Sequence, residues 1–284
     1  MSSTEHPGAT AGDQVRRITS GGRTRTYLLH LPPGSAPDRP APLLLMFHPA
    51  LATGRWFADL TGMSAAADPD GYVVAYPDGY RRTWNAGNCC GPAHRDGVDD
   101  VGFARDVIDD VSGIVRVDPA RTYAAGFSNG GAMAYRLACE MADRFAAITV
   151  ASAAFHVDPA ACRPSRPVSV LHFHGRADPI APYAGGPGAV EQTGPQVPVE
   201  TTIATWVRLN GCVAQPRTEL HRGQATLRTY PGCRGGTAVS LCVIENMGHQ
   251  WPGARQAGRD AAGPTTQDVA ATPMALEFFR AHHR

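Results

Sequence analysis

The residues with the clearest chemical potential are a serine and the two glycines that flank it. Residues 122–140 read TYAAGFSNGGAMAYRLACE, with Ser128 two positions after Gly126 and two before Gly130. An apolar run precedes the serine and a helix-like pattern follows it, which places the serine at a predicted strand-to-helix turn. Such a turn projects the hydroxyl from the sheet and aims the next N–H, that of Asn129, at a developing oxyanion. The pattern predicts a nucleophilic serine.

A serine nucleophile needs a base and an acid that orients the base, and two later segments supply them. VSVLHFHGRADPIAPY carries Asp178 just after an apolar run, and VIENMGHQWPG carries His249 after another. Serine, then acid, then histidine is the chain order of α/β-hydrolases, and strand ends are where parallel sheets present catalytic loops. The competing interpretation of the serine turn is a glycine-rich helix start that binds a phosphate or nothing.

Other residues compete for the acid and base roles. His172 and His174 precede Asp178 and so come too early in the chain order for the base, and His174 is better explained as a structural hydrogen-bonding residue. His221 lies in a polar stretch and is expected to be exposed. Asp158 follows a segment that ends less clearly as a strand, so it is the weaker candidate for the acid.

Aromatic side chains near the expected rim of the site could contact a substrate. Tyr80 and Trp84 lie in a polar, glycine-rich stretch, and Trp84 is the better candidate for a substrate wall. Packing is slightly favoured for Trp251, because its loop must hold the histidine rigid. The predicted substrate-binding set is Trp84, Tyr183 and Trp251.

The elements that must position these residues alternate between strands and helices. Apolar runs predict strands at residues 26–31, 43–48, 72–76, 122–126, 146–151, 168–173 and 239–244. Helical patterns fall at residues 99–115, 130–141, 201–209 and 273–281, the last with Pro273 at its first position. This alternation predicts an α/β fold with a mostly parallel sheet. Residues 182–198 and 252–265 read as surface loops.

Paired carboxylates at Asp99 and Asp100 could serve a glycosidase or a metal ion. An acidic cap at the start of the helix predicted over residues 99–115 explains them more simply. We therefore expect no metal site there.

Composition excludes several classes of protein. The 284 residues carry a net charge of +1, which gives no support to nucleic-acid or anionic-membrane binding. All 26 basic residues are arginine, which excludes a Schiff-base or P-loop lysine. No apolar run approaches the roughly 18 residues that span a bilayer. Residues 1–20 are predicted to be a disordered lead-in without a secretory signal, and residues 21–284 to be one domain.

Seven cysteines are present, and their spacing contains no C-x-x-C motif, which disfavours a zinc ribbon or a redox motif. Several separated cysteines suit an oxidising compartment, but an odd number leaves one unpaired in a monomer. Cys89 and Cys90 are either a vicinal disulfide or two thiols. Cys242, inside a predicted strand, is expected to be a buried free thiol.

Several motifs together resemble the polyhydroxybutyrate depolymerase and feruloyl esterase (LpqC-like) group of α/β-hydrolases, from about residue 22 to the C-terminus. They are TWNAGNCCG, VDDVGF, DPARTYAAGFSNGGAMAYRLAC, LHFHGRADPIAPY and GHQWPG. The resemblance implies that Ser128 is the nucleophile, Asp178 the acid and His249 the base. It also implies disulfides that join Cys139 to Cys162 and Cys212 to Cys233.

The oxyanion loop departs from the pattern of that group. The group has His-Gly-x after an apolar strand, whereas this chain has His48, Pro49 and Ala50. Proline has no N–H, so position 49 cannot donate. The resemblance places the donor at the third residue, so the N–H of Ala50 survives, with that of Asn129 as its partner. His48 is then a residue that anchors the loop.

The expected activity is hydrolysis of carboxylic esters through an acyl-enzyme, with hydroxyalkanoate or hydroxycinnamoyl esters as the substrates that the resemblance implies. An acyltransferase or amidase with the same triad, and a non-catalytic binding protein of the same fold, are the alternatives. We expect a monomer whose partner is its ester substrate, with no cofactor, metal, nucleic acid or membrane. The resemblance and the cysteines favour an extracellular location, and the N-terminus as written favours the cytoplasm.

Overall fold

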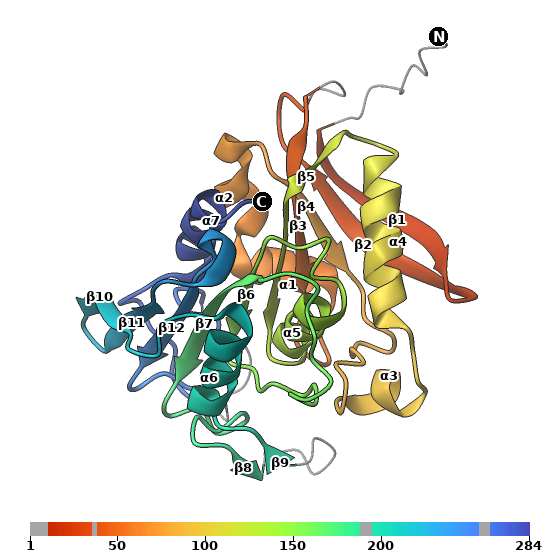
Figure 1. The fold of residues 1–284 in the computed structure, drawn as a ribbon. Helices are drawn as coiled ribbons and strands as arrows, with labels where there is room; N and C mark the ends of the chain where they lie inside the picture. The colour runs from red at the N-terminus through yellow and green to blue at the C-terminus, as the bar shows by residue number, and fades with distance from the viewer. Residues whose placement is uncertain (1–10, 36–38, 188–194, 256–261) are drawn as a thin grey trace.

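The computed structural model describes residues 11–35, 39–187, 195–255 and 262–284. Its strands are β1 Gly12–Ser20, β2 Arg23–Leu31, β3 Ala41–Phe47, β4 Val73–Pro77, β5 Val117–Phe127, β6 Ala147–Ala151, β7 Ser169–Gly175, β8 Gly186–Pro187, β9 Pro195–Gln196, β10 Arg217–Arg222, β11 Ala225–Tyr230 and β12 Val239–Ile244. Ten of them form one sheet in the order β1-β2-β4-β3-β5-β6-β7-β12-β11-β10 (Figure 1). The six neighbouring strands β4, β3, β5, β6, β7 and β12 are parallel to one another. Antiparallel strands extend the sheet on both sides, β2 and β1 next to β4 and β11 and β10 next to β12. The predicted mostly parallel sheet is confirmed.

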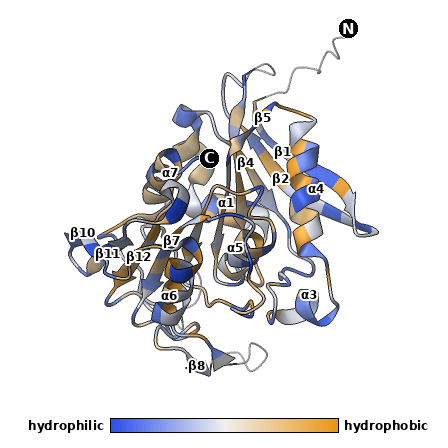
Figure 2. Cartoon of the chain, in the orientation of Figure 1, coloured by the Kyte–Doolittle hydropathy of each residue, from blue (hydrophilic) through white to orange (hydrophobic). Residues whose placement is uncertain are grey.

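Helices cover both faces of the sheet. They are α1 Gly54–Thr61, α2 Met63–Ala67, α3 Gly91–Arg95, α4 Asp100–Ser112, α5 Asn129–Glu140, α6 Val199–Asn210 and α7 Ala271–Ala281. The large buried apolar side chains of α4, α5 and α6 belong to one cluster, and those of α1, α2 and α7 belong to another on the opposite face. Figure 2 shows both hydrophilic and hydrophobic residues along α4, as expected of a helix with one buried face.

The central strands read as continuous apolar runs because both of their faces are covered. In β3, Leu43, Leu45 and Phe47 join the cluster under α4 and α5, while Leu44 and Met46 join the one under α1 and α7. Alternate residues of a strand point to opposite faces, so a strand between two helical layers needs apolar residues at every position. All seven predicted strands are present, as β2 to β7 and β12.

The N-terminal prediction is wrong from Gly12 onward. Strand β1 pairs with β2 along its whole length, and Arg16 of β1 forms an ion pair of 3.1 Å with Asp110 of α4. The strand was missed because its residues are polar and partly exposed, so no apolar run marks it. Residues 1–10 lie outside the described part of the chain. None of the described helices is both long enough and apolar enough to cross a bilayer.

The start of one helix and the loop predictions need correction, whereas the predicted cap of another helix is confirmed. Helix α7 starts two residues before Pro273, with Ala270 as its N-cap. Helix α4 is capped as predicted, because the Asp99 carboxylate accepts the N–H of Gly102 at 2.7 Å. The predicted loop 182–198 contains the short strands β8 and β9, and its residues 188–194 are not described. In the predicted loop 252–265, residues 256–261 are not described.

Two disulfides tie the helical layer to later segments. Cys139 of α5 is bonded to Cys162, and Cys212 after α6 is bonded to Cys233, as the resemblance implied. Cys242 of β12 is a buried free thiol, as predicted, and burial raises its pKa to about 12. A thiol with so high a pKa stays protonated and unreactive.

Candidate active site

Ser128 occupies the turn between β5 and α5 with φ 56° and ψ −124°. A positive φ is uncommon outside glycine and persists where the surroundings fix it. The Ser128 N–H donates to the carbonyl of Ala151 at 2.9 Å. A Cβ on Gly126 would collide with the backbone of Gly130, and one on Gly130 would collide with the carbonyl of Phe47. Glycine is therefore required on both sides of the serine, as the sequence predicted.

Asp178 and His249 lie in the loops that follow two neighbouring parallel strands, β7 and β12. Nδ1 of His249 lies 2.9 Å from Oδ2 and 3.1 Å from Oδ1 of the carboxylate. The two loops pass each other closely, since a Cβ on Gly175 would collide with the backbone of Met247. The structure therefore brings together the acid and the base that the chain order predicted.

The Asp178 carboxylate is held as an anion. Its side chain is buried, and Oδ1 accepts the N–H groups of Ile180 at 2.9 Å and Ala181 at 2.8 Å. Burial opposes its ionisation, but the hydrogen bonds and charge of His249 outweigh burial and lower the pKa of Asp178 below its usual value. A buried carboxylate at Nδ1 fixes the orientation of the imidazole and stabilises its protonated form.

The loop after β3 is fixed by the imidazole of His48. Its Nε2 accepts the N–H of Gly79 at 2.9 Å, so Nδ1 carries the proton and donates to the carbonyl of Pro49 at 2.7 Å. The ring is fully buried, and burial lowers the pKa of His48, which keeps it neutral. His48 anchors the loop, as predicted. The N–H of Ala50 has no acceptor among the described residues.

Trp84 ties this loop to the serine turn. Its indole N–H donates to the carbonyl of His48 at 2.9 Å, and its backbone exchanges two hydrogen bonds with the side-chain amide of Asn129, at 2.8 and 3.0 Å. The side chain is fully buried and packs edge-on against Phe47. The sequence predicted a substrate wall here because the surrounding stretch is polar. The structure instead buries the ring against the loop that follows β3.

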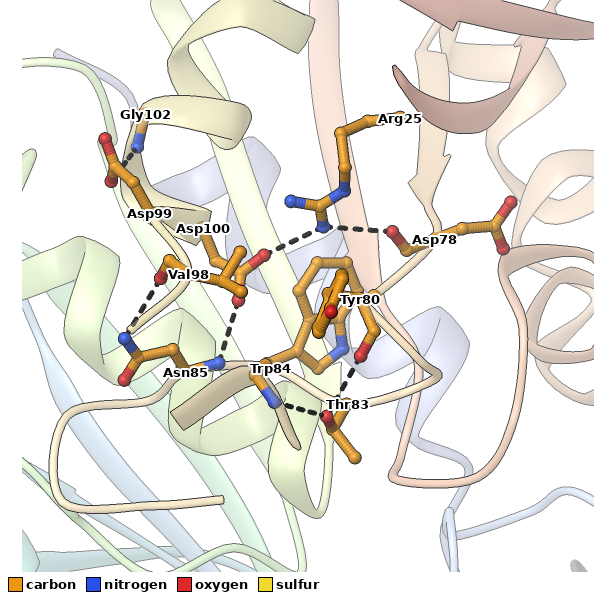
Figure 3. Close-up of polar contacts among 12 residues, drawn as sticks. Arg25, Asp78, Tyr80, Thr83, Trp84, Asn85, Val98, Asp99, Asp100 and Gly102 are labelled. Atoms are coloured by element: carbon orange, nitrogen blue, oxygen red, sulfur yellow. Dashed lines mark hydrogen bonds and ion pairs between the residues drawn. The ribbon is translucent and has the colours of Figure 1, made fainter. Parts of the chain in front are cut away.

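A buried ion pair holds the segment that carries Trp84 (Figure 3). Nη2 of Arg25 lies 2.8 Å from Oδ1 of Asp100, whose Oδ2 accepts the N–H of Asn85 at 2.8 Å. The same guanidinium donates to the carbonyl of Asp78 at 3.1 Å. The second carboxylate of the Asp-Asp pair is thus a structural partner of an arginine. Asp99 caps the helix as predicted, but the interpretation of Asp100 as part of the same cap is wrong.

One cavity of about 300 Å³ connects the proposed catalytic groups. Ser128, His249, Asn129 and Ala50 all line it. Most of the other lining residues are apolar or small, and they include Leu51, Pro92, Ala132, Ala153, Ala154 and Ile180. Sequence reasoning missed this wall because its members come from separate segments of the chain, and no local pattern marks them as neighbours. Cys90 also lines it and is paired with Cys89 as a vicinal disulfide, one of the two alternatives that the sequence left open.

The other predicted aromatic residues lie outside the described lining of this cavity. The buried Tyr183 donates its hydroxyl to Glu200, and the buried Trp251 donates its indole N–H to Thr272 at 3.1 Å. Packing explains both rings in this structure. Substrate contact by either of them stays a prediction.

The competing acid and base candidates lie elsewhere. His221 is on the exposed strand β10, where it contacts Thr226 at 3.0 Å. Asp158 accepts the N–H of Ala160 at 2.9 Å in its own turn. Neither lines the cavity, and the structure gives each a local role.

Comparison with known proteins relates this arrangement to esterases. The family model described as esterase PHB depolymerase matches residues 25–199. Feruloyl esterase B of Piromyces equi is 35% identical over 236 residues, which cover 79% of this chain and 42% of that protein. This chain therefore spans less than half the length of the Piromyces protein. NocK of Nocardia uniformis subsp. tsuyamanensis, which carries an esterase name, is 34% identical over 289 residues and covers 96% of this chain and 84% of its own.

Solved structures support the fold. The acetyl xylan esterase from Aspergillus awamori superposes with a TM-score of 0.63 at 13% identity, covering 94% of this chain and 99% of that one. A thermostable esterase gives a TM-score of 0.58 at 15% identity and covers 96% of this chain and 63% of that one. At such low identity these similarities concern the fold alone, and they confirm the α/β-hydrolase architecture.

Proposed function

We propose that this chain, which belongs to the esterase PHB depolymerase family, is a carboxylic ester hydrolase that acts through an acyl-enzyme formed on Ser128. The observation that carries the proposal is the shared cavity. Ser128 and His249 both line it, and the Asp178 carboxylate lies 2.9 Å from the far ring nitrogen of the histidine. A histidine oriented by a buried carboxylate, on the same cavity wall as a strained serine, supports an acyl-enzyme mechanism.

Acylation begins when the Ser128 hydroxyl transfers its proton to Nε2 of His249. The serine Oγ bonds to the ester carbonyl carbon, and the carbonyl oxygen becomes an oxyanion. Asn129 and Ala50 hold this oxyanion through their backbone N–H groups. His249 then protonates the alcohol, which leaves as the C–O bond breaks.

Deacylation repeats these steps with water. His249 takes a proton from the water molecule, whose oxygen attacks the acyl carbon, and the tetrahedral oxyanion forms again in the same place. Collapse breaks the bond to Ser128, and the protonated histidine returns the proton to the serine oxygen. The acid leaves and the enzyme is restored.

The proposed substrates are hydroxycinnamoyl esters first and hydroxyalkanoate esters second. Relatives named feruloyl esterase support the first, and the family description supports the second. The predominantly apolar wall of the cavity suits the hydrocarbon part of either acyl group.

A burst assay tests the mechanism. Wild type is expected to release a burst of p-nitrophenol from p-nitrophenyl butyrate, and Ser128→Ala is expected to show no turnover above background. Equal rates for the two proteins would refute the role of Ser128. A panel of methyl ferulate, short hydroxybutyrate oligomers and acetylated xylan then separates the substrate classes by kcat/KM.

The alternatives give distinct outcomes. An acyltransferase would consume the ester faster when an acceptor alcohol is added and would yield a new ester, whereas a hydrolase yields free acid. An amidase would cleave a feruloyl amide at a rate comparable with the ester. A non-catalytic binding protein is disfavoured by the esterase family to which the chain belongs.

A further inference from the structure

Three buried side chains form a hydrogen-bonded series that ends at the carbonyl of Ala181, beside the proposed acid. The hydroxyl of Tyr135 lies 2.6 Å from Nδ1 of His172, and Nε2 of His172 lies 2.9 Å from Nδ1 of His174. Nε2 of His174 in turn lies 2.8 Å from the carbonyl of Ala181. The phenol comes from α5 and the two histidines from β7, where positions two apart share a face.

The last acceptor fixes the direction of the whole series. A carbonyl only accepts, so Nε2 of His174 carries a proton and donates it to Ala181. In a neutral ring Nδ1 is then an acceptor, so His172 donates to it through Nε2. Nδ1 of His172 is in turn an acceptor, and the Tyr135 hydroxyl donates to it. Burial lowers the pKa of His172 and of His174, which keeps both rings neutral.

The proton at the end of the series faces the acid. Nε2 of His174 lies 3.5 Å from Oδ2 of Asp178, the same oxygen that lies 2.9 Å from Nδ1 of His249. The backbone N–H of Ala181, whose carbonyl His174 binds, donates to the other carboxylate oxygen at 2.8 Å. The reverse proton order would turn a lone pair of His174 toward both the carbonyl and the carboxylate, which is repulsive.

We propose that Tyr135, His172 and His174 are positioning residues that hold Asp178 in place through this single proton order. The inference rests on the proposed roles of Asp178 and His249. Neither the phenol nor the inner histidine lines the cavity in the described part of the chain, so they act through the acid and not on the substrate.

Ring contacts restrain the series. The two imidazoles are nearly coplanar, at 6° with centroids 5.2 Å apart, as their edge-to-edge hydrogen bond requires, and the Tyr135 ring stacks on Trp206 at 18° and 5.8 Å. Tyr135 and both histidines are at most 1% exposed. Rings held in this way cannot reorient to recover a lost partner, so a broken link leaves an unpaired buried group.

Nitrogen NMR of the wild-type protein tests the proton order without any turnover. Histidine labelled with ¹⁵N reports the tautomer of each neutral ring, and the His172→Gln and His174→Gln variants assign the two signals. Both rings are expected as neutral Nε2–H tautomers at neutral pH. An Nδ1–H tautomer or a protonated ring at either position would overturn the proposal, whether or not the protein cleaves esters.

Kinetics of matched variants test the positioning role. Tyr135→Phe removes the first donor and is expected to lower kcat/KM by about 3- to 10-fold, the range for one neutral hydrogen bond. Tyr76→Phe is the control, because its buried hydroxyl contacts Ser64 at 2.8 Å on the opposite face of the sheet. The control is expected to change kcat/KM by less than about 2-fold. Equal effects of the two variants would overturn the proposal.

A comparison of two substitutions of His174 separates a role in positioning Asp178 from a role in packing alone. His174→Gln keeps an N–H for the carbonyl of Ala181 and is expected to retain more activity than His174→Leu, with the difference in kcat and little change in KM. Equal kcat values for the two folded variants count against the proposal. Where His174→Leu does not fold, the comparison of Tyr135→Phe with its control decides. A wild type that cleaves no ester refutes the proposed function and leaves the NMR result standing.

Discussion

Removing Arg25 by Arg25→Met should destabilise the protein strongly, because it leaves a buried carboxylate without its counter-ion. Arg25 is 5% exposed and Asp100 is fully buried, and their charged groups lie 2.8 Å apart. The guanidinium also lies 3.9 Å from the centroid of the Phe103 ring and donates to the carbonyl of Asp78. In the variant, the described contact that remains to the carboxylate is the N–H of Asn85.

Breaking one side of a buried pair costs about 3–5 kcal/mol of unfolding free energy. A chain of 284 residues has an unfolding entropy of about 0.6 kcal/mol/K near its transition. The expected loss in Tm is therefore about 5–8 °C. An exposed pair gives the control, since Arg280 and Asp70 are 2.7 Å apart but 54% and 28% exposed. Arg280→Met should cost less than about 1 kcal/mol, which is under 2 °C.

The loss should depend on pH in a defined direction. Burial raises the pKa of Asp100 above its usual value of 3.8, and Arg25 counters this, so removing the arginine raises the pKa further. A carboxyl whose pKa is raised by folding stabilises the native state at low pH, and this contribution is lost as the pH rises through the folded pKa. The Tm deficit of Arg25→Met should thus be smaller at about pH 4 than at about pH 8.

Differential scanning calorimetry of the two variants and wild type, at both pH values, measures these differences. A deficit for Arg25→Met no larger than that for Arg280→Met would refute the reasoning. A deficit that grows toward low pH would also refute it, because the buried carboxylate would then not be the group that is left unpaired.

Three further predictions concern the loops and a crosslink. Trp84→Phe removes the donor to the carbonyl of His48 and should lower kcat/KM about 3- to 10-fold with an unchanged circular dichroism spectrum. Pro49→Gly should lower the unfolding free energy by about 0.4–1 kcal/mol in urea titration. It should leave the acyl-chain preference unchanged, since Pro49 is not among the described lining residues. Replacing Cys139 and Cys162 together by serine should cost about 3 kcal/mol in the same titration, given their separation of 23 residues.

The central strands and the positions of Ser128, Asp178 and His249 at strand ends were predictable because local sequence determines both. A strand covered on both faces must be apolar throughout, so the residues of β3 mark it directly. The serine turn needs glycine for steric reasons that hold in any fold, and the chain order then selects Asp178 and His249 from the other acids and histidines.

The parts that were missed depend on contacts distant in sequence. Strand β1 is polar and defined by its pairing with β2, and hairpin β10–β11 is likewise an exposed edge without an apolar run. The pairing of Arg25 with Asp100 joins residues 75 positions apart. The burial of Trp84 in a polar stretch follows from its bond to His48, and no local pattern predicts such a partner.

The adjacency of β7 and β12 limits where this chain can tolerate insertions. The two strands end side by side at the pair Gly175 and Ile244, and the loops that start there carry the proposed acid three residues later and the proposed base five residues later. One added residue in either loop would shift a catalytic group by about 3 Å, more than its hydrogen bond can follow. Engineering of substrate range should therefore keep both loop lengths and vary side chains of the cavity wall such as Leu51 and Ile180. Length changes belong in the exposed hairpin β10–β11, which lies at the edge of the sheet.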